Sequence, residues 1–272
     1  MKNAFTTLAT AAAVTLLALA AHAADLQLDK IKLPQGFSIS VFADAVPGAR
    51  SMALGDKGTL FVGSRRQGLV HAIVDTDGDN KADKVYVIAQ GFTSPNGVAF
   101  RDGSLYVAEI SRIVRYDDIE NKLDAPPEPV VVTDALPDKA THGWKYFAFG
   151  PDDRLYFGIG TPCDACDPMV EHNDERLGTL LSMNLDGSDL KPYVSGVRNS
   201  VGLTWHPDNG TLYFTDNGRD GMGDDIPDCE LNRVTKAGQH FGNPYFHGGD
   251  VPDPVHGEGK NPDDYVKPIQ KL

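Results

Sequence analysis

From Asn96 to Ile110 the chain reads NGVAFRDGSLYVAEI: an apolar segment, a tight turn at Asp102-Gly103, and a second segment of alternating apolar residues. Alternation on both sides of an Asp-Gly turn is typical of a β-hairpin. Similar stretches begin at Ser51, Lys145 and Val201, and they read SMALGDKGTLFVGSR, KYFAFGPDDRLYFGIG and VGLTWHPDNGTLYFTDN. The four starts lie 45, 49 and 56 residues apart (96 − 51, 145 − 96 and 201 − 145), which indicates an internal repeat.

Further strand-like segments follow each hairpin. Third segments read LVHAIVD, RIVRYDD, TLLSMNLDG and ELNRVTKAG, and outer segments read KVYVIAQGF, PVVVTDAL and KPYVSGV. Four strands in a unit of about 45 residues is typical of a propeller blade, whereas a β-sandwich does not repeat in this way. We therefore predict an all-β fold, a β-propeller of four-stranded blades over residues 24–272, with about four blades present.

The two ends of the chain carry their own signals. Lys2 precedes an apolar run over residues 9–20, and Ala21-His22-Ala23 has the small-x-small pattern of a cleavage site. This predicts a signal peptide over residues 1–23 and a periplasmic or secreted protein; no other stretch is apolar enough to span a membrane. The last residues, 264–272, resemble an outer strand that leads into a further blade, so we expect the chain to lack the last blades of its ring.

The net charge of the chain limits the classes of molecule that it is expected to bind. Lys and Arg number 25 and Asp and Glu number 38, which gives a net charge of −13. A field of this sign repels phosphate backbones, so we expect no nucleic-acid partner. It is compatible with divalent cations but names no substrate.

Three cysteines are present. Cys163 and Cys166 are predicted to close a local disulfide in an oxidising compartment, and Cys229 is left over. A zinc site needs a second pair of ligands, and a thioredoxin-like role needs a βαβ context, which the sequence does not contain.

An aspartate-rich loop lies between the third and outer strands of the first repeat. Asp75, Asp77, Asp79, Lys81 (through its carbonyl) and Asp83 occupy alternate positions, as in calcium-binding loops. Tyr86 stands where a helix-loop-helix site has its bidentate Glu. We interpret the loop as a structural calcium site between two strands; the alternative is an acidic turn without a metal.

Function in a propeller is concentrated where the first strand of a blade begins and the second strand ends. His142 lies at such a position and is a candidate general base. Arg198 and Asn199 occupy the same place one repeat later, where a guanidinium suits a carboxylate or polar ligand; a salt bridge between blades is the alternative. The loop at residues 215–232 is rich in Asp and Gly and is either a cation-binding or a solvated loop.

Taken together, these residues resemble the soluble PQQ-dependent glucose/sorbosone dehydrogenase family. The similar motifs are His142 followed by Pro151-Asp152, Gly-x-Arg-Asn-x-x-Gly-Leu over residues 196–203, and Glu-Leu-Asn at 230–232 followed by Gly-Asn-Pro at 242–244. The aspartate loop, Pro-Asn-Gly-Val at 95–98 and the Cys-x-x-Cys pair are most similar to the sorbosone-type branch.

The resemblance implies a six-bladed propeller that holds pyrroloquinoline quinone (PQQ) and Ca²⁺, oxidises a sugar hydroxyl or aldehyde, and passes electrons to an external acceptor, a cytochrome or a quinone. It assigns His142 as the general base, Arg198 and Asn199 to the cofactor, and the carbonyls of Gly218 and Arg219 to the cofactor's calcium. Glucose-oxidising members orient their His with an Asp where this chain has Thr161. By this comparison Asp164, or no carboxylate, takes that role.

Two other functions remain open. Calcium-dependent lactonases are also six-bladed propellers, and Asn199 and Thr215-Asp216 resemble their motifs, but the first channel strand here begins Arg50-Ser51 and lacks their Glu. The third reading is a non-catalytic, calcium-stabilised binding propeller. It explains the fold and the aspartate loop, but it does not explain why His142 and Arg198 lie at adjacent blade openings.

Overall fold

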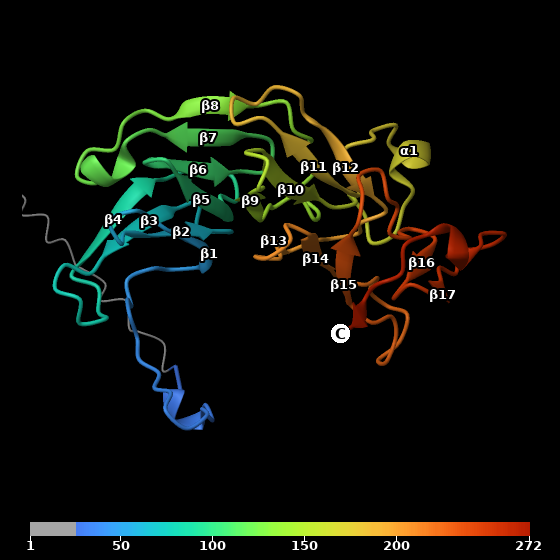
Figure 1. Ribbon diagram of the computed structural model, residues 1–272, viewed down its shortest axis with the longest axis horizontal. Coiled ribbons are helices and arrows are strands. Elements are labelled where there is room, and N and C mark those ends of the chain that lie inside the picture. The colour runs from blue at the N-terminus through green and yellow to red at the C-terminus, as the bar shows by residue number, and fades with distance from the viewer. Residues whose placement is uncertain (1–25) are drawn as a thin grey trace, which may run out of the picture.

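The computed structural model describes residues 26–272, so the signal peptide predicted for residues 1–23 lies outside the described part of the chain. The fold is all-β, with four four-stranded blades in chain order (Figure 1), as the repeat predicts. Blade 1 contains β1 (Ala49–Leu54), β2 (Leu60–Ser64), β3 (Val70–Val74) and β4 (Lys84–Ala89). Blade 2 contains β5 (Gly97–Arg101), β6 (Ser104–Ala108), β7 (Ile113–Tyr116) and β8 (Val130–Thr133). Blade 3 contains β9 (Phe147–Phe149), β10 (Leu155–Ile159), β11 (Thr179–Met183) and β12 (Lys191–Ser195).

Blade 4 is completed from the end of the chain. It contains β13 (Leu203–Trp205), β14 (Leu212–Asp216), β15 (Glu230–Val234) and β18 (Gln270–Lys271). Between β15 and β18 the chain forms a small hairpin, β16 (Phe246–His247) and β17 (Val251–Pro252). Short helices are η1 (Leu28–Lys30), η2 (Ile119–Asn121), α1 (Pro168–Glu171) and η3 (Pro262–Asp264). No helix within residues 26–272 is long and apolar enough to cross a membrane.

Every blade is an antiparallel meander in which each strand pairs with the next, and β18 takes the outermost place beside β15. The turns are those that the sequence predicts. The turn between β5 and β6, for example, places Asp102 and Gly103 at positive φ (50° and 75°), which is the backbone geometry of a tight Asp-Gly hairpin turn.

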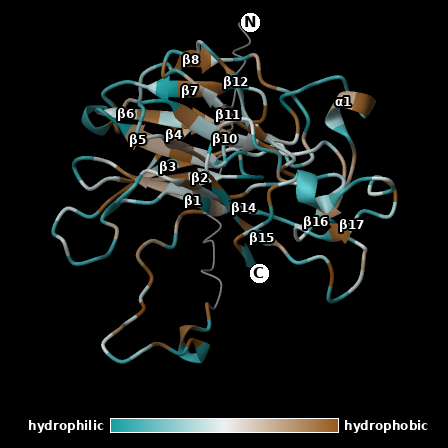
Figure 2. Cartoon of the chain, turned by 45° about the vertical axis from the view of Figure 1, so that its right-hand side comes forward, coloured by the Kyte–Doolittle hydropathy of each residue, from teal (hydrophilic) through white to brown (hydrophobic). Residues whose placement is uncertain are grey.

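The hydrophobic core consists of three layers between successive blades. Phe61 of blade 1 stacks on Phe100 of blade 2, with ring centroids 5.5 Å apart, and Phe157 is fully buried between blades 2 and 3. Between blades 3 and 4, Phe214 packs edge-on against Phe241 at 4.9 Å. Hydrophobic segments recur along the stacked strands in Figure 2. Burial of each such side chain contributes roughly 1.5–3 kcal/mol to the free energy of folding. The layers therefore stabilise the packing of each blade against the next.

The first strands of the blades lie side by side around a common groove. Neighbour contacts link β1 to β5, β5 to β9 and β9 to β13. The groove has a volume of about 320 Å³ and is lined by residues at or near the first strand of every blade: Ala49, Arg50, Ser51, Asn96, Trp144, Tyr146 and Val201. The loops that enter these strands therefore lie around one opening, which we call the channel mouth.

Candidate active site at the channel mouth

His142 lies in the loop that leads into β9, with a positive φ of 50°. Its carbonyl accepts a hydrogen bond from the Gly160 N–H (3.2 Å), at the end of β10. A side chain at position 160 would not fit, because a Cβ there would lie 2.5 Å from the His142 Cβ and 2.5 Å from the Arg198 carbonyl oxygen. The glycine after Ile159 thus allows the His142 and Arg198 segments to approach each other.

The protonation state of His142 follows from its partner. Its Nδ1 lies 2.9 Å from the main-chain oxygen of Thr161. A carbonyl oxygen can only accept, so Nδ1 carries the hydrogen and Nε2 presents a lone pair. No protein group among residues 26–272 binds Nε2. Burial, followed by the positive charge of Arg198, lowers the pKa of His142, so the imidazole is neutral and able to accept a proton at neutral pH.

The group that orients His142 is not a carboxylate. The comparison by sequence left Asp164, or no carboxylate, for this role, and Asp164 makes no hydrogen bond to the imidazole. The Thr161 main chain holds the ring instead, and the Thr161 N–H is in turn bound by the Arg198 carbonyl at 2.9 Å. The main chain of Thr161 therefore connects the His142 loop with the Arg198 loop.

Arg198 and Asn199 are fixed by a buried carboxylate that the sequence placed in an acidic loop. Asp216, the last residue of β14, accepts hydrogen bonds from the main-chain N–H groups of Arg198 (2.8 Å) and Asn199 (2.6 Å). Glu230 lies opposite Asp216 in the β14–β15 ladder. Burial, and then the charge of Glu230, raises the pKa of Asp216 to about 8.

The Arg198 side chain is almost completely buried, with 4% of its surface exposed. Its Nε donates to the Asp164 carbonyl oxygen (2.7 Å), its Nη1 to the Asn217 carbonyl oxygen (3.1 Å), and its Nη2 to the carboxylates of Asp164 and Asp220. Four of its five N–H groups are used, and one on Nη1 is left. Arg198 therefore acts as a bridge between loops of blades 3 and 4 and keeps one donor for a ligand.

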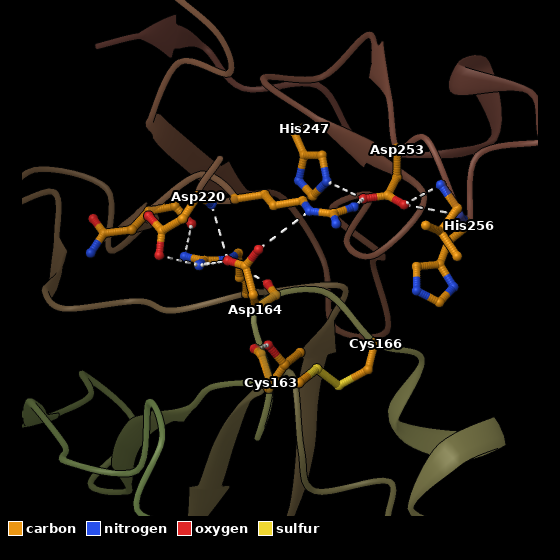
Figure 3. Close-up of polar contacts among 12 residues, drawn as sticks. Cys163, Asp164, Cys166, Asp220, His247, Asp253 and His256 are labelled. Atoms are coloured by element: carbon orange, nitrogen blue, oxygen red, sulfur yellow. Dashed lines mark hydrogen bonds and ion pairs between the residues drawn. A yellow bond between two sulfur atoms is a disulfide. The ribbon is translucent and has the colours of Figure 1, made fainter. Parts of the chain in front are cut away.

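Asp164 also binds Arg219, so one carboxylate joins two arginines (Figure 3). Burial by itself raises the pKa of Asp164, but the Asp220 N–H and the Arg198 guanidinium outweigh it and hold this pKa below its usual range. The disulfide between Cys163 and Cys166 brackets Asp164 in the chain and closes the loop that presents it. Cys229 is a free, half-buried thiol.

Arg219 connects the site to the β16–β17 hairpin. Its Nη1 donates to Asp253, which also lies 2.9 Å from Nε2 of His247. Burial raises the pKa of Asp253, yet hydrogen bonds from His247, from two main-chain N–H groups and from Arg219 outweigh it and leave this pKa well below the ordinary value. Nothing local in the sequence connects His247 and Asp253 with Arg219, so sequence reasoning did not identify this contact.

The carbonyls predicted to bind the cofactor's calcium are available. The Gly218 and Arg219 carbonyl oxygens accept no hydrogen bond from any described residue. Gly218 is itself closely packed, since a Cβ there would lie 2.9 Å from Pro227 Cγ and 3.1 Å from the Asp228 carbonyl oxygen. Free carbonyl oxygens on a fixed turn are suitable ligands for Ca²⁺, so these two residues fit the proposed metal.

Some of the predicted calcium ligands in the aspartate loop lie close together. One oxygen each of Asp75, Asp77 and Asp83 lies within 4.8 Å of the others. Asp79 is outside this group; it accepts a hydrogen bond from the Lys81 N–H at 2.8 Å. Asp83 accepts from the Thr76 hydroxyl and N–H, which lower its pKa. Three of the four predicted side-chain ligands are therefore close enough to share a cation.

Another buried group was missed by sequence reasoning. Lys145, in the segment that leads into β9, is fully buried, and its Nζ donates to the Gly143 carbonyl oxygen (2.7 Å) and to the Ile110 carbonyl oxygen. Burial lowers its pKa to about 7. The aromatic residues around Lys145 in the sequence could have indicated that it is buried. Its contacts tie the backbone after His142 to blade 2.

The positions of possible metal ligands are relevant to the alternative function as a lactonase. Groups of three or more possible metal ligands occur within residues 26–272 at Asp75, Asp77 and Asp83 and at Cys166, Glu171 and His172. Neither group lines the groove described above, where Arg50, Ser51 and Asn96 lie instead. The first channel strand does not supply an axial metal ligand.

Several solved structures have a similar fold. The Trichoderma reesei enzyme of carbohydrate-active enzyme family AA12 matches with a TM-score of 0.68 and 18% identity over 81% of this chain and 66% of that one. The PQQ-bound aldose sugar dehydrogenase of Streptomyces coelicolor matches at 0.65 and 23%, over 86% and 70%. The soluble aldose sugar dehydrogenase of Escherichia coli, in its apo form, matches at 0.60 and 14%, over 81% and 71%. At these identities the likeness establishes the fold, a propeller shared with quinoprotein sugar dehydrogenases.

Sequence relatives do not name an activity. An uncharacterized protein of Borreliella burgdorferi is 28% identical over 233 residues, which is 80% of this chain, and this chain spans 57% of the length of that protein. One family profile, described as a domain of unknown function (DUF7133), matches residues 23–244. Since this is most of the chain, the protein belongs to the DUF7133 family.

Proposed function

We propose that this propeller is a PQQ-dependent oxidoreductase that oxidises a sugar hydroxyl or aldehyde at the channel mouth. The observation that carries the proposal is the His142 imidazole, half-buried, held by Thr161 through Nδ1 and free at Nε2. A neutral imidazole of this kind is a suitable general base for an alcohol proton. The fold shared with the PQQ-bound Streptomyces coelicolor enzyme supports the choice of cofactor.

In this proposal each residue near His142 has a specific chemical role. Nε2 of His142 accepts the proton of the substrate hydroxyl as the C–H hydrogen leaves as a hydride. PQQ, when bound, supplies the two-electron acceptor. The imidazolium that forms is stabilised by the Thr161 carbonyl and by the charges of Asp164 and Asp220, which favour the protonated form. Arg198 would contribute positive charge beside the reacting centre, and Asn199 its side-chain amide.

The remaining assignments complete the proposal. The carbonyls of Gly218 and Arg219 would hold the calcium that accompanies the cofactor, and Asn199 would contact the cofactor beside Arg198. An external acceptor, a cytochrome or a quinone, would take the electrons. We place the protein in the periplasm or outside the cell, after removal of the predicted signal peptide, and we propose that it acts as a sorbosone-type enzyme.

The direct test is reconstitution. The purified chain is titrated with PQQ in the presence of Ca²⁺, and oxidation of aldoses and aldehydes is followed with an artificial electron acceptor. We expect saturable quinone binding and dye reduction with at least one substrate. If the chain binds no quinone, or hydrolyses lactones without oxidising any sugar, the proposal is wrong.

A second test concerns the aspartate loop. We expect Ca²⁺ to raise the melting temperature and a chelator to reverse this, because an ion that binds only the folded state stabilises it by about 2.7 kcal/mol at a hundred times its Kd. Asp75→Asn with Asp77→Asn should abolish most of the shift. Asp56→Asn, an exposed turn residue of the same blade, is the matched control. A calcium response that survives the double substitution would place the ion elsewhere.

A further inference from the structure

Three arginines of blade 1 gather at the channel mouth. The pairing of Ala49 with Ser64 places the start of β1 beside the end of β2. Arg50 and Arg65, the residues that follow this pair, are therefore neighbours, and Arg66 comes next in the chain. The Arg50 Nε donates to Oδ1 of the buried Asn96 at 3.2 Å. Arg50 also lines the groove at the channel mouth, and Arg65 and Arg66 follow the adjacent end of β2; we call these three arginines the channel-mouth cluster.

Arg65 is held by an aromatic ring and not by a carboxylate. Its guanidinium carbon lies 3.5 Å from the centroid of the Trp144 ring, and no described residue hydrogen-bonds to its N–H groups. Burial, then the charges of Arg50 and Arg66, lowers the pKa of Arg65. Stacking leaves the N–H edge of the guanidinium open, and this edge is the part that binds an oxyanion through two hydrogen bonds.

The absence of a counter-ion is unusual for this chain, which carries a net charge of −13. Seven arginines among residues 26–272 have a carboxylate within ion-pair distance: Arg101, Arg112, Arg115, Arg154, Arg176, Arg198 and Arg219. That leaves four of the eleven without one, and three of these four are the channel-mouth cluster. Concentrating unneutralised positive charge at one opening of an acidic protein costs folding free energy and indicates an anionic ligand.

The groove has room for such a ligand beside Trp144. Its volume of about 320 Å³ is at the lower end of small-molecule sites, which are roughly 300–1,000 Å³. Trp144 connects the two halves of the site: one part of it stacks on Arg65, and its ring lies edge-on to the His142 imidazole with centroids 6.2 Å apart. A monosaccharide that reaches His142 would therefore present its far end to the arginines.

We propose that Arg50, Arg65 and Arg66, with Trp144, bind the carboxylate of a sugar acid such as a hexuronate at the channel mouth. The guanidinium edges take the two carboxylate oxygens, and Trp144 packs on the sugar ring. That this sugar acid is the substrate rests on the proposed function; the carboxylate site itself does not, because it is built from blade 1 charges alone.

The experiment uses Trp144 as the reporter. The chain has two tryptophans, and Trp205→Phe leaves Trp144 as the only one while keeping a ring against Tyr156. Fluorescence of this variant is titrated with glucuronate, glucose and PQQ at low and high salt. We expect glucuronate to bind about tenfold or more tightly than glucose, the size of effect that one charge-assisted hydrogen bond gives, and to weaken with salt. Calorimetry on the wild-type chain repeats the measurement without the Trp205 substitution.

Substitutions identify the site. Arg50→Gln with Arg65→Gln should reduce glucuronate affinity at least about tenfold and leave glucose binding unchanged. Arg233→Gln, an exposed and unpaired arginine of β15, should change neither. Equal binding of glucose and glucuronate, or a double variant that binds glucuronate like the parent, overturns the proposal. Loss of PQQ binding alone in that variant would assign the arginines to the cofactor's carboxylates and overturn the sugar-acid assignment. Since the sugar titrations contain no quinone, their outcome is independent of whether the chain proves to be an oxidoreductase.

Discussion

Replacing His142 by alanine should lower the rate of dye-linked sugar oxidation by about a hundredfold to ten-thousandfold, the usual cost of losing a general base. The reason is geometric. Nδ1 is committed to the Thr161 carbonyl, so Nε2 is the one nitrogen of His142 that remains able to accept a proton. Quinone affinity should change little, because the proposed cofactor contacts come from Arg198, Asn199 and the carbonyls of Gly218 and Arg219.

The pH dependence of the same reaction gives a second readout. Only the neutral imidazole can take the proton, and burial with the charge of Arg198 lowers the pKa of His142. The rate should therefore be constant above the ordinary histidine pKa of about 6.5 and fall only at lower pH, as the ring becomes protonated. In His142→Ala this acid limb should disappear together with most of the rate.

A matched control is His206→Ala. His206 lies in the turn between β13 and β14, where its Nδ1 accepts a hydrogen bond from the Asp208 N–H at 3.2 Å. It should leave both the rate and the pH profile unchanged. Undiminished oxidation by His142→Ala would remove His142 from the mechanism and with it the main support for this chemistry.

The fold was predictable because its determinants are local. The hairpin at residues 96–110 combines alternating apolar residues with an Asp-Gly turn, and both features act within a few residues. Repetition at 45 to 56 residues then implies stacking, because a blade with two apolar faces needs neighbours to cover them. The layers around Phe61, Phe157 and Phe214 are where this reasoning places the core.

The site was predictable only in part, because its contacts are distant in sequence or involve the main chain. His142 and Arg198 could be found from their place before a first strand. The carbonyl of Thr161 that orients His142 could not, since a main-chain acceptor leaves no trace in residue identity. Asp164 meets Arg198 across 34 residues and Arg219 across 55. Such pairings depend on how blades 3 and 4 are set against each other, which the repeat alone does not specify.

The structure changes the effect that we expect from substituting Arg198. The sequence suggested either a ligand contact or a bridge between blades, and the guanidinium is a bridge that retains one N–H of Nη1 for a ligand. Arg198→Met should thus affect two properties. It should lower the melting temperature, because the Asp164 and Asn217 carbonyl oxygens lose their donor, and it should weaken quinone binding.

The size of the binding effect follows from the one N–H that Arg198 retains for a ligand. A hydrogen bond to a charged group is worth about 1.5–3 kcal/mol, which corresponds to roughly tenfold to 150-fold in Kd. Arg176→Met is the control for destabilisation alone, because Arg176 also bridges elements, through Asp174 and the Ala135 carbonyl oxygen, but none of its hydrogen bonds reaches the loop that carries Gly218 and Arg219. If both variants melt earlier and only Arg198→Met loses quinone affinity, Arg198 contributes to the cofactor site beyond its structural bridge. If quinone affinity is the same in the two folded variants, Arg198 is a structural residue, and the cofactor must be held by Asn199 and the Gly218–Arg219 turn without it.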